Sequence, residues 1–443
     1  MNGILKGGFL LALCMLVTKV LGAIYRIPLT NFLGAEGIGI YQTVFPFYSI
    51  LLTVSATGIP NALSKIIGEG KNAEKVLYKS IIAFGGIGLA GSLVMAAGAK
   101  YLSTLQGNPS SYKAYLAISP SVFFVSILSC FRGYFQGKGN MLPTGISQIT
   151  EQTIKLITGL TLIFFLSLSG ENGAIVACFA VTVSEALSLL FMVIYKRKKE
   201  GYKPVIDDFY AKNAEKTTLK EIFKVVLPVT LTSIILPFSR FIDSFIVINS
   251  INNYSAFAVS LYGLYSGAVE SVVGVPVALC YGFAVSALPE ISKNKNGNSG
   301  RKVILYTLLL SITAGVITYT TADYAIGFLY RRLNAEEITV ATRLLKISAM
   351  QVVLLPVLQA STLVLIGKDR LYLPGIFLCL GVTVKLILSF TLTKIPSLNI
   401  YGMTFSDIAC YFVAGFCNLL YIIRERKQKA IHPAISGRIE TKT

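Results

Sequence analysis

The sequence is poor in charge, and in acidic residues most of all. Asp, Glu, Lys and Arg make up 14% of its 443 residues, against ~25% in a typical soluble domain. Apolar residues reach 54%, and the mean hydropathy is +0.67. So few charges do not cover the surface of soluble domains of this total length. The composition therefore excludes a soluble enzyme and a disordered protein, and it favours a chain of membrane-spanning helices, each of ~20 apolar residues.

Metal-binding side chains are equally scarce. The single histidine, His432, lies in a polar stretch near the C-terminus. The seven cysteines all lie in apolar segments, and none forms a CxxC pair. A protein zinc site needs several such ligands close together. We therefore interpret the cysteines as buried apolar residues, and we expect no metal, no cofactor and no disulfide scaffold.

Twelve apolar runs of spanning length follow one another along the chain. They lie near residues 4–28, 38–67, 76–100, 114–136, 144–169 and 173–195, and then near 222–249, 256–289, 302–330, 338–366, 372–393 and 399–423. The sequence thus predicts an all-α polytopic membrane protein of about 12 helices. We expect two six-helix lobes at 1–195 and 222–423, a cytoplasmic connecting loop at 196–221, and a basic cytoplasmic tail at 424–443.

The distribution of basic residues sets the orientation. With the N-terminus inside, 28 of the 40 Lys and Arg residues fall on the inner side, 7 fall on the outer side and 5 lie within helices. Cytoplasmic loops carry such an excess in membrane proteins. We predict that both termini face the cytoplasm of a bacterial cell membrane. The formal net charge of +19 then reflects topology and membrane lipids as partners, and nucleic acid is not expected as a partner.

The two halves carry matching motifs. Gly137–Pro143 before the fifth run matches Gly367–Pro374 before the eleventh, 230 residues later. Gly58-Ile59-Pro60 in the second run matches Gly274-Val275-Pro276 in the eighth. Six helices per half give both halves the same orientation, and parallel repeats of this kind are typical of transporters. We expect Gly58, Pro60, Gly274 and Pro276 to act as hinges.

The first predicted helix carries basic residues and no acid. Lys19, Gly22 and Arg26 are spaced i, i+3 and i+7, so they share one face. A charge inside a membrane is costly and normally faces a cavity or a partner. We therefore expect Lys19 and Arg26 to line a cavity that attracts an anion. The alternative is that Arg26 extends to the outer membrane interface.

Other predicted helices carry charges of both signs. Arg240 with Asp243, and Glu151 with Lys155, have spacings that favour an internal ion pair in each helix. Lys385 has no acidic neighbour in its own helix, and Glu185 is a single acid. Glu270 precedes the Gly274-x-Pro276 break, where free backbone carbonyls would favour a cation or proton site. The alternative for Glu270 is a basic partner across the cavity.

Three segments resemble a known family. They are residues 19–28 (KVLGAIYRIP), 33–41 (LGAEGIGIY) and 58–65 (GIPNALSK). They resemble the stage V sporulation protein B and polysaccharide-biosynthesis group of the multidrug/oligosaccharidyl-lipid/polysaccharide exporter superfamily. That superfamily also contains MurJ-type lipid II flippases and MATE antiporters. The resemblance is densest over residues 19–70.

The resemblance implies a flippase that moves an undecaprenyl-pyrophosphate-linked saccharide through a central cavity, with no bond chemistry. It assigns Lys19 and Arg26 to the pyrophosphate. Arginines that MurJ-type proteins carry in helices two and eight are absent here, and Arg240 would substitute for them. A coupling cation or the membrane potential is left open as the driving force. The alternatives are a MATE-type cation-coupled antiporter and a membrane glycosyltransferase or polymerase, which would need acids in a sizeable outer loop.

The predicted topology is testable by labelling. Single cysteines introduced near Lys75 and Lys212 should be shielded from an impermeant thiol reagent in intact cells, because the basic loops face inward. Cysteines near Asn252 and Asn334 should be labelled. Labelling near Lys212 from outside would contradict the orientation.

Overall fold

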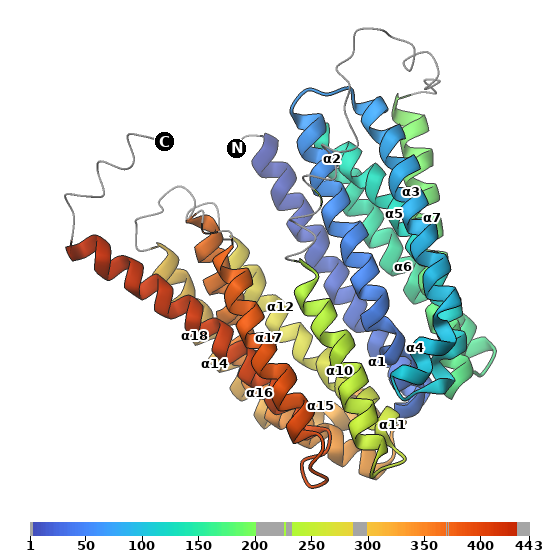
Figure 1. Ribbon diagram of the computed structural model, residues 1–443, viewed down its shortest axis with the longest axis vertical. Coiled ribbons are helices and arrows are strands. Elements are labelled where there is room, and N and C mark those ends of the chain that lie inside the picture. The colour runs from blue at the N-terminus through green and yellow to red at the C-terminus, as the bar shows by residue number, and fades with distance from the viewer. Residues whose placement is uncertain are drawn as a thin grey trace. The chain divides into compact units, whose positions relative to one another are not determined.

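The described part of the chain is almost entirely helical. In the computed structural model it comprises residues 3–200, 226, 233–286, 299–368, 370 and 372–431, and it contains no β-strand (Figure 1). The predicted all-α class is confirmed. The connecting loop beyond residue 200, His432 and the tail beyond residue 431 lie outside the described residues.

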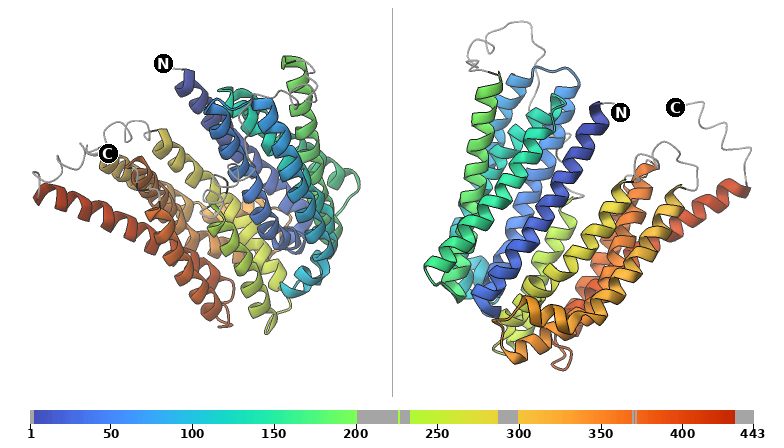
Figure 2. Two further views of the ribbon diagram at one scale, coloured as in Figure 1. Left: turned by 45° about the horizontal axis from the view of Figure 1, so that its top comes forward. Right: turned by 180° about the vertical axis from the view of Figure 1, so that it is seen from behind.

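The first two predicted spans are joined at a glycine. Helix α1 (Gly3–Thr53) consists of two helical segments that meet at Gly34, which has φ 71° and ψ 178°. Only glycine adopts this combination readily, because it has no Cβ. The two blue segments lie side by side and run in opposite directions (Figures 1 and 2). Gly34 is therefore the reversal between the predicted runs 4–28 and 38–67.

A π-helix lies at the first predicted hinge and another precedes the second. Val54–Gly58 forms the π-helix η1, and α2 (Ile59–Gly68) follows with Pro60 in its first turn. In the second case α11 (Ala258–Gly263) leads into the π-helix η3 (Leu264–Val269) and then α12 (Glu270–Ser286), which contains Pro276. Proline lacks the N–H that a regular helix needs, and π-helical turns are local departures from the regular ladder. The hinge role of these segments stays a prediction.

Most other predicted spans coincide with one helix or a helix pair. These are α3 (Ala73–Ala97) with α4 (Ala99–Leu105), α5 (Tyr112–Gly137), α6 (Leu142–Phe165), α7 (Gly170–Glu200), α10 (Ile235–Asn252), α14 (Ser299–Thr320) with α15 (Ala322–Leu329), α16 (Ala335–Gly367), α17 (Leu373–Leu392) and α18 (Tyr401–Ile431). The two repeated motifs also share local structure. Helices α5 and α16 end at a glycine, and Pro143 and Pro374 are the second residues of α6 and α17.

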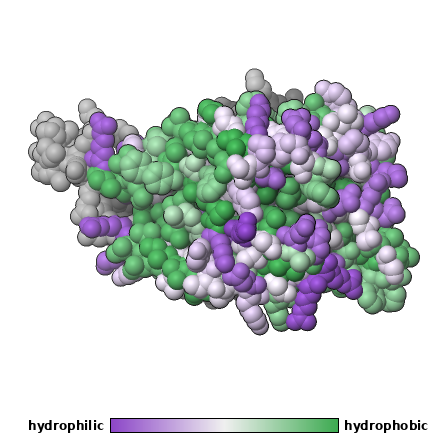
Figure 3. All heavy atoms as spheres, turned by 90° about the horizontal axis from the view of Figure 1, so that it is seen from below, coloured by the Kyte–Doolittle hydropathy of each residue, from purple (hydrophilic) through white to green (hydrophobic). Residues whose placement is uncertain are grey.

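Nine stretches within the described residues are long and apolar enough to cross a membrane, and the first of them, Val20–Gly68, contains the reversal at Gly34. The predicted runs 144–169 and 222–249 correspond to α6 and α10, which lie outside these nine. The count of twelve stays a prediction. Many large apolar side chains are exposed, Val94 and Phe165 among them. Exposed apolar side chains are expected where a helix contacts lipid tails. The view from below in Figure 3 shows hydrophobic residues in green beside hydrophilic ones in purple. The chain is a multi-pass membrane protein.

The helices form two units by their contacts. The first comprises Met1–Ser271, Ala325–Ala341 and Thr393–Ile400, and the second comprises Val272–Tyr324, Thr342–Leu392 and Tyr401–Thr443. In the first unit α1 packs on α5, α6, α7, α10 and α11 around a core that includes Tyr25, Tyr41 and Tyr115. In the second unit α17 packs on α18, and Ala284, Val303 and Val364 contribute to a smaller core. The predicted division into lobes 1–195 and 222–423 stays a prediction.

Uncharged amide side chains tie α10 and η3 to the N-terminal helices within the first unit. The Gln106 amide donates to Ser244 Oγ at 2.7 Å, and the Gln42 amide donates to the Ser266 carbonyl at 2.6 Å. Asn249 and Asn252 donate to the carbonyls of Leu105 and Gly107, at 2.9 Å each. We call Gln42, Gln106, Asn249 and Asn252 the neutral amide network. Each of these bonds joins segments more than 130 residues apart in sequence.

Two glycines allow α1 and α11 to approach closely. A Cβ at Gly39 would overlap the carbonyl oxygen of Val259, and a Cβ at Gly263 would overlap the carbonyl oxygen of Ala35. The atoms in the way belong to backbone, so side-chain repacking does not relieve the overlap.

We predict that Gly39→Ala lowers the stability of the protein by about 1–3 kcal/mol, the usual cost of overpacking. The matched control is Gly86→Ala, because nothing lies within 4 Å of a Cβ at Gly86. The midpoint of thermal unfolding in detergent should fall for the first variant and not for the second. Equal midpoints would contradict the close backbone contact.

Candidate functional site

Arg26 lies on the first segment of α1 and faces the second segment. Its side chain is partly buried, and its Cζ is 6.0 Å from the centre of the Phe45 ring on the second segment. Among the described residues no acid forms an ion pair with it. Tyr25, next to it, is 1% exposed. Lys19 lies in the same helix, and its side chain is outside the described part. The positive charge of Arg26 thus faces an aromatic ring, and no described carboxylate neutralises it.

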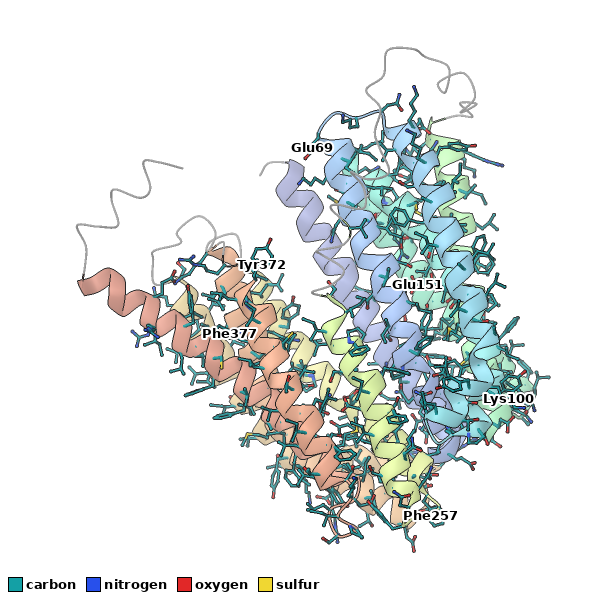
Figure 4. All side chains as sticks on the ribbon, viewed as in Figure 1. Glu69, Lys100, Glu151, Phe257, Tyr372 and Phe377 are labelled. Atoms are coloured by element: carbon teal, nitrogen blue, oxygen red, sulfur yellow. The ribbon has the colours of Figure 1, made fainter. Side chains whose placement is uncertain are left out.

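Glu151 and Lys155 do not form the ion pair predicted from their spacing in α6. Glu151 Oε2 lies 2.9 Å from Arg132 Nη2, a buried residue of α5, and Arg132 Nε also donates to Ser147 Oγ. Lys155 Nζ lies 5.5 Å from the centre of the Tyr25 ring, and no ion pair joins it to a described acid. Figure 4 shows Glu151 among the helices of the first unit, away from the ends marked by Glu69 and Lys100.

Arg132 belongs to the predicted run 114–136. It lies inside α5 and is 5% exposed. A buried arginine needs a partner. Arg132 and Lys155 both lie near enough to compete for Glu151, and the guanidinium of Arg132 is favoured because it offers several donors in a fixed plane. Glu151 therefore pairs between helices and Lys155 is left to the aromatic ring.

Glu185 lies on α7 in the same unit. It is 2% exposed, and its Oε1 accepts a hydrogen bond from the Tyr48 hydroxyl at 3.3 Å. Tyr48 comes from the second segment of α1, three residues after Phe45, and the two rings are 5.6 Å apart between centres. Glu185 is thus connected through Tyr48 to Phe45, the residue that faces Arg26.

Arg240 and Glu270 form an ion pair between α10 and α12, with 3.8 Å between Arg240 Nη2 and Glu270 Oε2. Glu270 therefore has the basic partner that was considered as its alternative role. Asp243, one turn after Arg240 in α10, is fully buried. The side chain of Arg240 is 54% exposed. The Arg240–Glu270 pair is therefore accessible from outside the helix packing, whereas the Arg132–Glu151 pair is buried.

Lys385 has a partner in the second unit that the sequence did not reveal. Its Nζ lies 2.7 Å from Asp407 Oδ1, and both side chains are buried. Asp407 is the one acidic residue in the last predicted span, 399–423. Its position there is the feature of the sequence that could have suggested it as the partner of Lys385. Nearby in sequence, Glu425 binds both Lys368 and Arg370 of the turn between α16 and α17. Within the described residues no group of three His, Cys, Asp or Glu side chains is placed to hold a metal ion.

The helical arrangement is that of a known class of membrane transporters. It matches the solved structure of lipid II flippase MurJ in an inward closed conformation with a TM-score of 0.76, 13% identity, and coverage of 94% of this chain and 87% of that one. It matches the inward-facing structure of a multidrug resistance MATE family transporter of the MOP superfamily with a TM-score of 0.75, 14% identity, and coverage of 93% and 95%.

The sequence places the chain within this class. The model of the polysaccharide biosynthesis protein family matches residues 4–295, and the chain belongs to that family. Stage V sporulation protein B of Bacillus subtilis (strain 168) is 27% identical over 418 residues, which cover 90% of this chain and 79% of that protein. Lipid II flippase MurJ of the same organism is 23% identical over 431 residues, which cover 88% and 78%. The sequence-based assignment to this group is confirmed.

The Arg132–Glu151 pair yields a stability prediction. Glu151→Leu leaves a buried guanidinium without its carboxylate and should cost about 3–5 kcal/mol. The double variant Arg132→Met/Glu151→Leu removes both charges and should recover most of this loss. Thermal unfolding in detergent gives the measurement.

The control is the exposed pair Lys113–Glu171, whose atoms are 3.2 Å apart. Glu171→Gln should cost less than about 1 kcal/mol, because water screens the pair. A Glu151→Leu variant as stable as Glu171→Gln would contradict the importance of the buried pair.

Proposed function

We propose that this protein moves an undecaprenyl-pyrophosphate-linked saccharide, such as a peptidoglycan, spore-cortex or polysaccharide precursor, across the bacterial cytoplasmic membrane by alternating access. The family and the two Bacillus subtilis relatives support this class of substrate. One of these relatives is a lipid II flippase, so we propose no catalytic residue and no bond chemistry.

The observation that carries the proposal is the unpaired Arg26. The first segment of α1 contains no Asp or Glu, and no described acid pairs with Arg26. A guanidinium at membrane depth is costly unless it meets a partner or water. A pyrophosphate supplies such a partner, because its oxygens match the fork of N–H donors. The substrate would then supply the counter-charge that the protein omits.

Further cations support an anionic ligand in the first unit. Lys155 lies over the Tyr25 ring without an ion-paired acid, and Arg240 is largely exposed beside Glu270. In the proposed mechanism Arg26 grips the pyrophosphate, and Lys19, Lys155 and Arg240 raise the positive potential around it. Lys385 would have no direct role, since Asp407 neutralises it.

The proposed movement is a rocking of the lobes 1–195 and 222–423. The helices would bend at the π-helix η1 with Gly58 and Pro60, and over the stretch from the π-helix η3 to Gly274 and Pro276. The regular pattern of backbone hydrogen bonds is interrupted at η1 in the first lobe and at η3 in the second. Each lobe would therefore have one flexible segment.

A MATE-type antiporter is the second candidate, because a solved MATE transporter shares the fold. Fold alone does not identify a substrate. A cation exporter needs an acidic site, and the first segment of α1 offers basic residues only. The charge of this segment therefore favours the anionic lipid-linked substrate.

Substitution of Arg26 tests the proposal in a strain depleted of its own flippase. Arg26→Ala should abolish growth rescue at normal protein level, because loss of a charged partner costs about 2–5 kcal/mol of binding. Arg26→Lys should rescue in part, since it keeps the charge and loses the fork. Lys19→Ala should have a milder effect than Arg26→Ala.

Arg197→Ala is the matched control. Arg197 lies exposed in the last turn of α7, and its loss should leave rescue intact. Immunoblots of membrane fractions confirm equal amounts of each variant. Full rescue by Arg26→Ala would exclude Arg26 from substrate binding.

A further inference from the structure

Glu185 is a buried carboxyl group with one oxygen that has no partner. It lies midway along α7 and is 2% exposed. Its Oε1 accepts the Tyr48 hydroxyl at 3.3 Å, which is long for an O–H···O bond. Its Oε2 has no hydrogen-bond partner among the described residues. An ionised carboxylate with so few donors is strongly disfavoured away from water.

The charged groups around Glu185 are engaged elsewhere. Helix α7 packs on α1, α5 and α6, and these contribute Tyr48, Arg132, Glu151 and Lys155 to the electrostatic surroundings of Glu185. Arg132 is bound to Glu151, and Lys155 lies over the Tyr25 ring. Among the described residues no ion pair therefore joins Glu185 to a cation, although Arg132 and Lys155 lie near enough to act on it.

Further unsatisfied atoms accompany Glu185. The side-chain oxygens of Ser129 on α5, Gln148 on α6 and Ser188 on α7 are buried without a hydrogen-bond partner among the described residues. Each lies three residues from a member of the charged cluster, namely Arg132, Glu151 and Glu185, and thus on the same helix face. Buried polar atoms of this kind are the usual partners of internal water.

We propose that Glu185 is a proton-binding site and that its protonation is coupled to the movement of the lipid-linked substrate; the coupling rests on the proposed function. In the proposed cycle the carboxyl group first holds one proton and is neutral, because few donors surround it. When the proton leaves to water, the carboxylate carries one negative charge. The Tyr48 hydroxyl and the Lys155 ammonium then stabilise that charge, and the next proton restores the neutral group.

The coupling has a contiguous packed route to Arg26. Tyr48 touches Glu185, the Tyr48 and Phe45 rings are 5.6 Å apart, and the Phe45 ring is 6.0 Å from Arg26 Cζ. Because all three contacts converge on the second segment of α1, a shift of Tyr48 toward an ionised Glu185 displaces the ring that faces Arg26. Proton release would thereby change the affinity for the anionic ligand, and ligand binding would reciprocally change proton affinity.

Infrared difference spectroscopy of the purified full-length protein tests the proton site, with the proton as the only probe. Spectra in acidic minus alkaline buffer should contain a protonated-carboxyl band that shifts in heavy water. Glu185→Gln should remove this band, and Glu171→Gln, on the exposed end of the same helix, should keep it. Tyr48→Phe should move the titration midpoint to higher pH, because it removes a donor that favours the carboxylate. A wild-type protein without the band, or a Glu185→Gln variant that retains it, would overturn the site.

Growth rescue tests the coupling. Glu185→Gln, which is fixed in the neutral form, should fail to rescue a flippase-depleted strain, at wild-type protein level and with an unchanged unfolding midpoint. Full rescue by this variant would overturn the coupling. The infrared result does not involve Arg26 or a lipid substrate, so it decides the proton site even where the Arg26 variants reject the proposed function.

Discussion

The free-energy cost of placing charge in an apolar environment constrains this protein more than any other interaction. A chain with few charges places several of them within its helices, and each needs compensation. Arg132 with Glu151, and Lys385 with Asp407, are compensated by a partner on another helix. Within the described part of the chain, Arg26 and Lys155 contact aromatic rings and pair with no acid. The incompletely compensated group marks the place where a ligand with the opposite charge gains most on binding.

The aromatic side chains of α1 give these cations a common support. Tyr41, Phe45 and Tyr48 form a continuous row of ring contacts along the second segment, with centres 5.4 and 5.6 Å apart. Tyr25, on the first segment, packs so closely that a Cβ at Gly159 of α6 would meet its hydroxyl at 2.7 Å. Rigid rings of this kind hold cations in place without neutralising them. Packing therefore fixes the positions of these cations and leaves their positive charge in place.

The helices were predictable from the sequence because hydrophobic length is a local property. The apolar runs coincide with helices, and the Leu-Gly-Ala-Glu-Gly stretch at residues 33–37 contains the glycine of the reversal. The ion pairs were not predictable to the same degree. Spacing rules consider partners within one helix, whereas Glu151 pairs with a residue 19 positions earlier and Lys385 with one 22 positions later. Partner choice depends on which helices pack together, and this is not encoded in a local pattern.

The neutral amide network has a consequence for how voltage acts on the protein. Moving one elementary charge through the whole membrane potential changes the energy by ~2.3 kcal/mol per 100 mV. Gln42, Gln106, Asn249 and Asn252 hold their segments together with dipoles that carry no net charge. An electric field therefore performs almost no work when these bonds break or form. The membrane potential therefore acts on the charged helix segments. The hydrogen bonds of the neutral amide network keep nearly the same strength at a low and at a high membrane potential.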